Sequence, residues 1–388
     1  MHSSTSQPTS TNRVNVIIIG GGVVGCAIAR EISKHTSDVF LLEQLPKLGM
    51  ATSTRNSGVI HSGIYYRRGS LKAKLCVEGN RLTKEFCAQH DVPHNLCGKL
   101  VVASRESEIE ALERLAENGR NNGVEGLRMV SRKRIHEREP HVIALAALEV
   151  PSTGIVSAEA LVKAYARVAT EQGASILTDA RVTNLRSAGD AIAVDIEVGD
   201  PADPASLTRE TVEARCVVNS AGLYADEVAA LLGSSHYRIY PVRGEYAEVT
   251  GPKASLVNAL VYPLPHTDGL SLGVHLTRTL WGTVLVGPTA RYVAKKNDYE
   301  SDREPVEDFL RDALPLLPEL KLEDLRLAYS GLRPKLVPPD EHGMADFIIA
   351  RDAVYPRAIH MVGIESPGLT AAPALAQYVS SMVAETLA

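Results

Sequence analysis

Residues 14–32 read VNVIIIGGGVVGCAIAREI, and this stretch decides the fold. Its first six residues are apolar and mostly β-branched, which is typical of a parallel strand covered on both faces. They run into the pattern G-x-G-x-x-G and then into small and apolar residues in a helical arrangement. Gly20 permits a tight turn, Gly22 lets the backbone approach a pyrophosphate, and Gly25 lets the helix pack on the strand. The stretch predicts a dinucleotide site, the alternative being a glycine-rich turn in an α/β fold without a nucleotide.

A second strand supplies the acidic residue that such a site uses. Residues 38–42 are mostly apolar, and Glu43 follows them about twenty residues after the glycine loop. A carboxylate in this place can accept hydrogen bonds from both hydroxyls of a ribose. We therefore predict that Glu43 binds the ribose of the dinucleotide.

Two later segments favour FAD over a nicotinamide cofactor. Residues 216–226 read as an apolar strand that enters a helix, and residues 358–363 read as another strand. A helix follows the second of these from about Gly368, where its free N–H groups and dipole favour an anion. Reduced flavin carries negative charge at its N1/C2=O edge, so an FAD site needs this arrangement and a nicotinamide site does not.

The composition excludes several other classes of protein. The chain has 388 residues, 45% of them hydrophobic, and a net charge of −5, as in an ordinary soluble globular protein. The near balance of charge predicts no nucleic-acid partner. Five scattered cysteines without a C-x-x-C pair predict no disulfide framework and no metal site. Residues 1–13 lack the pattern of a secretory signal, and no apolar run reaches the roughly 18 residues of a membrane span. We therefore expect a cytoplasmic protein without an integral membrane span.

Seven further segments carry a resemblance to a known family. They are RNSGVIHSGIYY (55–66), SLKAKLC (70–76), CGKLVVA (97–103), TGIV (153–156), PVRGEY (241–246), YPLP (262–265) and LGVHLT (272–277). With the glycine loop, they resemble the D-amino-acid-oxidase superfamily of FAD-dependent oxidoreductases, which includes glycine oxidase and glycerol-3-phosphate dehydrogenase. Within it, the match is closest to L-2-hydroxyglutarate dehydrogenases. The loop ESPGLTAAP (365–373) departs from that subgroup and looks more like the glycine oxidase type.

The resemblance implies an α/β fold with two discontinuous domains. A Rossmann-like FAD-binding domain of the glutathione-reductase type is expected from residues 14–96, 150–232 and 331–388. A second, α+β substrate domain built on an antiparallel sheet is expected from residues 97–149 and 233–330. The run of Tyr, Val and Gly with turn signals over 236–290 supports the antiparallel sheet.

The motifs and the resemblance together imply FAD as cofactor and a set of residues that bind it. These are Gly20, Gly22, Val23, Val24, Glu43, Gln44, Thr52, Ser53, Arg55, Asn56, Ser57, Gly58, Val59, His61, Val182, Ala221, Gly222, Arg333, Gly363, Glu365, Ser366, Pro367, Gly368, Leu369 and Thr370.

Three residues are expected to carry the chemistry on the substrate side. Histidine suits the removal of a hydroxyl proton at neutral pH, and we assign this base to His275, the alternative being a histidine satisfied by a backbone carbonyl. His61 follows the glycine loop in a family motif and is expected to position substrate or flavin. Arg333 matches the arginine with which the superfamily holds a substrate carboxylate, and its planar guanidinium can make two parallel hydrogen bonds, the alternative being a structural arginine that binds carbonyls.

The remaining substrate contacts follow from the same motifs. Arg243 and Arg278 are candidates for a second carboxylate, and the hydroxyls of Tyr65, Tyr246 and Tyr262 are expected to close the polar end of the pocket.

The sequence therefore predicts oxidation of a small 2-hydroxy acid, L-2-hydroxyglutarate, to the 2-oxo acid by hydride transfer to flavin N5. One alternative is an amine or amino-acid oxidase of the glycine or D-amino-acid oxidase type, and another is a flavin redox sensor without turnover. The sequence leaves oxygen or a quinone as electron acceptor, and a quinone would bring the protein to the inner face of the membrane.

Overall fold

The structure is a computed structural model that describes residues 13–265 and 272–388. Its first layer is an eight-stranded sheet. Strands β12, β1, β2 and β9 run parallel to one another, and β20 adds to β12 in the same direction. The sheet consists of β1 (Arg13–Ile19), β2 (Val39–Leu42), β9 (Ser175–Leu177), β10 (Ala180–Ala188), β11 (Ala191–Val198), β12 (Thr208–Asn219), β19 (Ile348–Arg351) and β20 (Ala358–Val362). The parallel strands predicted from the sequence are confirmed, as is the order of strand, glycine turn and helix.

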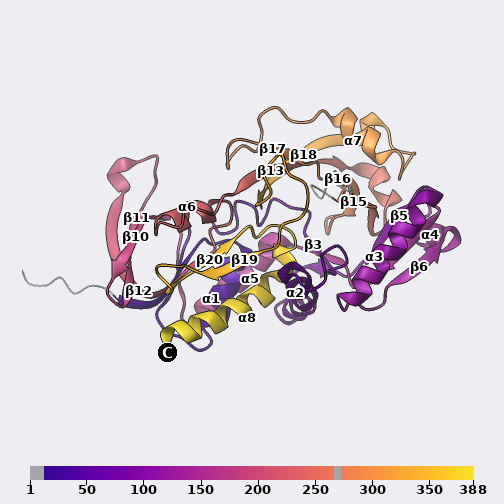
Figure 1. Ribbon diagram of the computed structural model, residues 1–388. Helices are drawn as coiled ribbons and strands as arrows, with labels where there is room; N and C mark the ends of the chain where they lie inside the picture. Colours follow the sequence, from indigo (N-terminus) through magenta and orange to yellow (C-terminus); the bar gives the residue numbers. More distant parts are fainter. Residues whose placement is uncertain (1–12, 266–271) are drawn as a thin grey trace, which may run out of the picture.

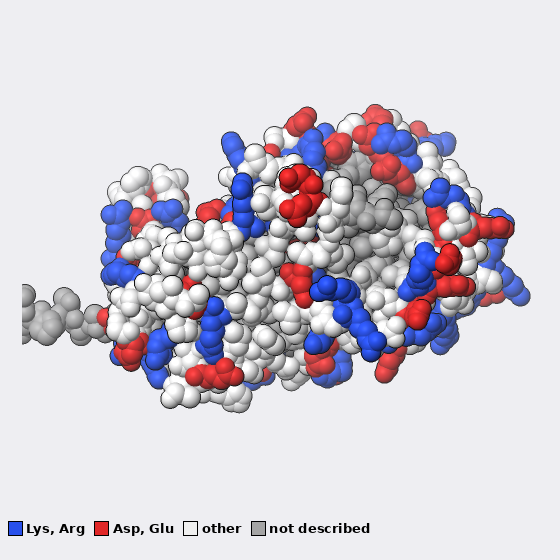
Figure 2. Space-filling view, viewed as in Figure 1, with Lys and Arg blue, Asp and Glu red and all other residues white. Residues whose placement is uncertain are grey.

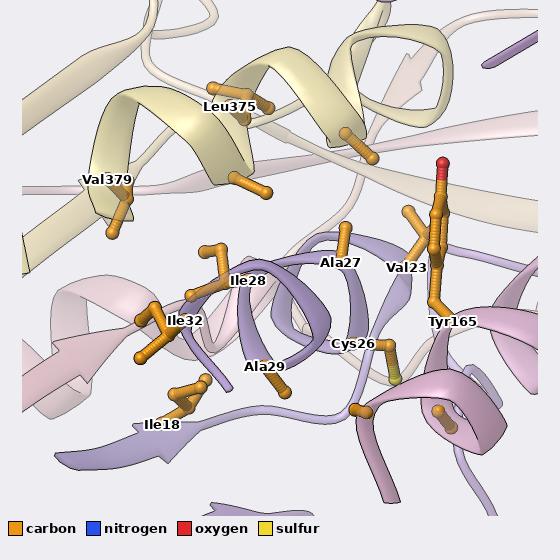
Figure 3. Close-up of a cluster of buried hydrophobic side chains, with 14 of the residues drawn as sticks. Ile18, Val23, Cys26, Ala27, Ile28, Ala29, Ile32, Tyr165, Leu375 and Val379 are labelled. Atoms are coloured by element: carbon orange, nitrogen blue, oxygen red, sulfur yellow. The ribbon is translucent and has the colours of Figure 1, made fainter. Parts of the chain in front are cut away.

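Four helices pack together beside this sheet. They are α1 (Val23–Ile32), α2 (Leu71–Gln89), α5 (Ala158–Glu171) and α8 (Gly368–Leu387). α1 contacts both α5 and α8, and α2 contacts α8 (Figure 1). Figure 3 shows Val379 of α8 turned toward Ile32 of α1, with Tyr165 of α5 beside the same helix, and Leu375 of α8 belongs to the same buried cluster. The C-terminal helix therefore covers the helix that follows the glycine turn.

The second layer is a nine-stranded sheet that is antiparallel apart from the β5–β14 pair. It consists of β5 (Lys99–Ala103), β6 (Arg128–Ser131), β7 (Ala146–Val150), β13 (Tyr240–Val249), β14 (Leu260–Pro263), β15 (His275–Arg278), β16 (Val284–Gly287), β17 (Arg291–Tyr292) and β18 (Leu325–Lys335). The helices that pack on these strands are α3 (Ile109–Asn121), α4 (Arg132–Arg138) and α7 (Val306–Ala313). The antiparallel sheet expected over 236–290 is confirmed.

The two layers are joined by strands and loops that interleave along the chain. A small third sheet consists of β3 (Val59–Ile60), β8 (Gly154–Val156) and β4 (His94–Asn95). Along the chain, its strands come between strands of the first large sheet and strands of the second. The short helix α6 (Ala225–Ala230) follows β12. The expected domain boundary after residue 330 falls inside β18, which pairs with β13 as far as Lys335. We therefore place the end of the second layer after residue 335.

The outer surface carries charges of both signs. Figure 2 shows lysines and arginines interspersed with aspartates and glutamates over the face in view. The strands β10 and β11 project as a hairpin from one end of the molecule (Figure 1), and residues 199–207 between β11 and β12 are almost all exposed. No helix within the described part of the chain is long and apolar enough to cross a membrane.

The packing of α8 gives a stability prediction. Leu375 is fully buried against the other helices, so Leu375→Ala is expected to lower the free energy of unfolding by about 2–5 kcal/mol through the cavity that it leaves. Urea unfolding followed by circular dichroism measures the change. The control is Tyr378→Ala on the same helix, where a side chain that is 43% exposed should contribute within about 0.5 kcal/mol. Equal losses in both variants would contradict the proposed packing.

Candidate functional site

The turn between β1 and α1 is built on close contacts that only glycine allows. Gly20 has a φ of 105°, in the left-handed region. A Cβ on Gly25 would lie 1.9 Å from the carbonyl oxygen of Gly20, so the first turn of α1 rests directly on the loop. A Cβ on Gly22 would lie 2.9 Å from Ser53 Oγ, which accepts a hydrogen bond from the Val23 N–H at 2.9 Å. The roles of turn and close packing that the sequence assigned to Gly20 and Gly25 are confirmed.

Glu43 stands at the end of β2 and faces this turn. Its Oε2 accepts a hydrogen bond from the Gly21 N–H at 2.7 Å, and its Oε1 accepts one from the Leu45 N–H at 2.8 Å. Burial raises the pKa of the Glu43 carboxyl, although these backbone donors oppose the shift. Glu43 thus holds the glycine loop in shape while it lines the adjoining cavity.

That cavity has a volume of about 400 Å³ and runs between the two layers. One end is formed by the carboxyl ends of β1, β2 and β12, where open α/β sheets bind their ligands. The other end is formed by β13, β14, β15 and β18 of the second sheet. Among the cofactor-binding residues predicted from the sequence, all but Gly58, Gly363 and Thr370 line this cavity.

Those three residues shape the backbone around the cavity and do not face it. Gly58 and Gly363 have φ values of 65° and 72° and occupy turns. Thr370 Oγ1 accepts a hydrogen bond from the His61 N–H at 2.9 Å and donates one to the Val59 carbonyl at 3.2 Å. Thr370 joins α8 to the segment around His61, and cofactor contact by these three residues stays a prediction.

The cavity has the chemistry that FAD requires. Six basic residues line it against two acidic ones, which suits the two phosphates of the dinucleotide and an anionic substrate. The residues before the two helices, Gly22 before α1 and Pro367 before α8, form no side-chain cap hydrogen bond, so both helix ends present positive dipole charge, although Ser53 Oγ accepts from the Val23 N–H. The residues that would hold the pyrophosphate lie at α1, and those that would face the flavin ring lie at α8.

His275 is held with one ring nitrogen satisfied and the other available. It begins β15 and is 4% exposed, and its Nδ1–H donates to the Gly273 carbonyl at 2.8 Å. This bond leaves Nε2 as the unprotonated nitrogen of the neutral ring. The ring stacks on Tyr262 at 3.7 Å between centroids. Burial lowers the pKa of His275 to about 3, so the ring is neutral at neutral pH and can accept a proton.

His61 lies on the opposite side of the cavity, next to the loop before α8. Its Nε2 is 3.3 Å from Ser366 Oγ, and its Nδ1 is buried without a partner among the described residues. Burial lowers the pKa of His61 to about 3. The position between β3 and the loop before α8 fits the positioning role predicted from the sequence.

Arg333 reaches the cavity from β18. Its Nη1 donates to the Thr289 carbonyl at 3.2 Å, and a Cβ on Gly244 would lie 2.6 Å from Nη2. No carboxylate of residues 13–265 or 272–388 forms an ion pair with this guanidinium. Arg333 thus lines the cavity, where Gly244 provides the space for it, and its binding of a substrate carboxylate stays a prediction.

Two arginines predicted for a second carboxylate are used elsewhere. Arg243 is fully buried and donates to Glu245 Oε1 at 2.9 Å and to Asp298 Oδ1 at 3.0 Å. Arg278 donates to the backbone carbonyls of Ala254 and Val257. Neither lines the cavity, and both have internal acceptors, so we withdraw their assignment to the substrate.

The structure places two of the three predicted tyrosines in the lining of the cavity and the third outside it. Tyr246 and Tyr262 are buried and line the cavity, whereas Tyr65 lies behind its wall. The Tyr65 hydroxyl accepts a hydrogen bond from Lys99 Nζ at 3.3 Å. Tyr65 therefore contacts the substrate region only through its neighbours.

An ion-pair network in the cavity wall was not predicted from the sequence. Glu365 Oε1 lies 2.9 Å from Lys72 Nζ, its Oε2 lies 3.7 Å from Lys335 Nζ, and both lysines are at most 5% exposed. Burial raises the pKa of Glu365, but the two ammonium groups outweigh it and lower that pKa overall. The network fixes the loop before α8, where Ser366 Oγ lies 3.5 Å from the Tyr66 hydroxyl. In the sequence, the signal for Lys72 was its place in the family segment SLKAKLC.

The family of FAD dependent oxidoreductases matches residues 15–382. The chain is 33% identical over 419 residues to the mitochondrial L-2-hydroxyglutarate dehydrogenase of Arabidopsis thaliana, covering 98% of this chain and 85% of that one. It is 32% identical over 408 residues to L-2-hydroxyglutarate dehydrogenase of Escherichia coli strain K12, covering 96% and 93%.

Solved structures share the architecture. Dithionite-reduced L-alpha-glycerophosphate oxidase from Mycoplasma pneumoniae with FAD bound superposes with a TM-score of 0.85 at 28% identity, over 95% of this chain and 94% of that one. Glycine oxidase from Geobacillus kaustophilus superposes with a TM-score of 0.77 at 23% identity, over 97% and 95%, and shares the fold.

The buried network gives a prediction for the site. Glu365→Gln removes the negative charge that pairs with the buried ammonium of Lys72 at 2.9 Å, so the free energy of unfolding should fall by about 3–5 kcal/mol. Urea unfolding of the flavin-loaded protein measures the loss. The control is Glu385→Gln, because Glu385 is 72% exposed in its pair with Arg351 and should contribute within about 0.5 kcal/mol.

A double variant tests whether charge is the cause. Adding Lys72→Met to Glu365→Gln removes the uncompensated charge and should restore part of the lost stability. A double variant that is no more stable than Glu365→Gln alone would contradict the ion-pair explanation.

Proposed function

The chain belongs to the family of FAD-dependent oxidoreductases, and we propose that it oxidises L-2-hydroxyglutarate to the corresponding 2-oxo acid. It is an enzyme, and its cofactor is FAD. The proposal for the substrate is supported by the names of the relatives and by one feature of the cavity. A neutral histidine and an arginine that forms no ion pair with a carboxylate of the described residues line the same cavity.

The residues of the cavity have separate roles in this reaction. FAD would be held by the glycine loop before α1 and the loop before α8, and when bound it would supply the acceptor for the hydride of the hydroxy acid. His275 accepts the hydroxyl proton at Nε2, because Nδ1–H is held by Gly273. Arg333 binds the α-carboxylate with its guanidinium and so fixes the orientation of C2. Tyr246 and Tyr262 are buried beside them and exclude water from the reacting atoms.

The charges of the cavity favour a hydroxy acid over an amino acid. The described carboxylates that line it are Glu43 and Glu365. Glu43 accepts hydrogen bonds from the glycine loop, and Glu365 is paired with two lysines. Neither is free to bind a substrate ammonium group, so the amino-acid oxidase alternative has less support.

Anaerobic reduction of the bound flavin tests the proposed substrate. We expect L-2-hydroxyglutarate to bleach the flavin absorbance near 450 nm in the purified holoenzyme, and glycine and D-amino acids to leave it unchanged. Bleaching by an amino acid with release of ammonia, or by no 2-hydroxy acid at all, would overturn the proposal. Exposure of the reduced sample to air, or to a quinone, then identifies the electron acceptor by which of them restores the absorbance.

The proton acceptor gives a second prediction. His275→Gln keeps a polar side chain but removes the base, so the rate of anaerobic flavin reduction should fall by about 10²–10⁴-fold. Because burial holds the pKa of His275 near 3, this base should not be protonated between pH 5 and pH 8, and its titration should not lower the wild-type rate there. The matched control is His141→Gln at an exposed ion pair, which should reduce at the wild-type rate. A rate for His275→Gln within about twofold of the wild type would assign the proton to another group.

A further inference from the structure

Lys99 is a buried lysine that lies behind the cavity wall. It begins β5, has no exposed surface and ranks among the largest fully buried side chains. Its neighbours Val101 and Ala103 on the same face of the strand belong to an apolar cluster. A lysine is seldom buried in this way without a partner that compensates its charge.

The contacts of the ammonium group are aromatic. Lys99 Nζ donates to the Tyr65 hydroxyl at 3.3 Å and lies 4.4 Å from the centroid of the Tyr65 ring. It also lies 4.7 Å from the centroid of the Tyr262 ring. Two rings and one hydroxyl stabilise a cation through their negative faces, but they do not neutralise it.

No described residue supplies the missing negative charge. Every carboxylate ion pair of residues 13–265 and 272–388 involves a cation other than Lys99. Burial lowers the pKa of Lys99 to about 7, so a large part of the population is charged at neutral pH. The protein thus keeps a buried site for a positive charge with no carboxylate of residues 13–265 or 272–388 paired to it.

The position of Lys99 connects this charge to the substrate end of the cavity. Tyr262, which Lys99 contacts, lines the cavity and stacks on His275 at 3.7 Å. Arg243 and Arg278, which the sequence offered for a second carboxylate, are occupied by internal acceptors. A dicarboxylic acid held by Arg333 at one end would place its other carboxylate toward a second cation, and Lys99 is the cation that lies against the ring of Tyr262.

We propose that Lys99 is a specificity-determining residue whose ammonium group, with Tyr65 and Tyr262, positions the second carboxylate of a dicarboxylic 2-hydroxy acid. This inference rests on the proposed function and extends it from the reacting end of the substrate to the distal end. Lys99 acts as a positioning residue through the rings of Tyr65 and Tyr262, and it takes no part in the transfer of the proton.

The titratable groups around Lys99 stay neutral near neutral pH, whereas Lys99 itself titrates there. Tyr65 lies in a loop, Tyr262 in β14 and Cys76 in α2. Burial raises the pKa of each of these side chains, so all three are neutral. His61 and His275, both with a pKa of about 3, are neutral as well. Binding of a second carboxylate should therefore weaken as pH rises through about 7, because Lys99 loses its proton.

Two substrates and one substitution test the proposal. L-2-hydroxyglutarate is compared with its 5-amide, in which an uncharged group of similar size replaces the second carboxylate. Lys99→Met keeps the apolar stem and removes the charge, so the KM for the acid should rise about 10- to 100-fold with kcat changed far less. The KM for the amide should stay within about twofold of the wild-type value.

The pH dependence separates this role from a structural one. In the wild type, the KM for the acid should rise between pH 6 and pH 9, and in Lys99→Met it should be flat over this range. Lys133→Met on the exposed face of α4 is the control and should behave as the wild type in both respects. An equal change of KM for acid and amide, or an unchanged KM for the acid, would overturn the role of Lys99.

Binding without turnover distinguishes the failure of this proposal from failure of the proposed function. Glutarate has both carboxylates and no hydroxyl, and its binding is followed by perturbation of the flavin absorbance. If wild-type enzyme is reduced by L-2-hydroxyglutarate but Lys99→Met binds glutarate as tightly as the wild type, only the Lys99 proposal fails. If no 2-hydroxy acid reduces the wild type, the proposed function fails, and weaker glutarate binding in Lys99→Met would still support a carboxylate site.

Discussion

The contact between the first turn of α1 and the loop after β1 is the constraint on which the first layer depends. A Cβ on Gly25 would come within 1.9 Å of the Gly20 carbonyl, so the helix and the loop can meet only because both positions are glycine. This contact sets the direction of α1, and α5 and α8 pack on α1. It also leaves the N-terminal N–H groups of α1 at the mouth of the cavity, where they can face phosphate oxygens.

The same helix packing carries the C-terminal end of the chain to the cavity. Because α8 lies against α1 and α2, the loop before it is brought beside His61 and Tyr66. Glu365 in that loop is neutralised by two buried lysines, which costs desolvation but holds the loop in one arrangement. The cavity is therefore formed by segments more than 300 residues apart, and its charges depend on how the layers are packed.

Much of the fold could be predicted because its signals are local. The β-branched run before Gly20, the position of Glu43 and the last strand and helix each occupy one continuous stretch, and the structure has all of them. The boundary expected after residue 330 was misplaced because β18 continues through it. Pairing of β18 with β13 is a contact between distant segments, and no local signal marks where it ends.

The sequence by itself determined the glycine turn and the arrangement of strands and helices around it, because these depend on residue type and spacing along the chain, whereas the candidates His275 and Arg333 followed from the resemblance to the family. Only the tertiary structure decided which charged side chains face the cavity. Arg243 and Arg278 look alike in the sequence, yet both are satisfied by acceptors within their own layer. Lys99 looks like an ordinary strand residue, yet the pairing of β5 with β14 buries its ammonium beside Tyr262. The physical reason is that the free energy of a charge depends on the partners and water around it, and folding sets both.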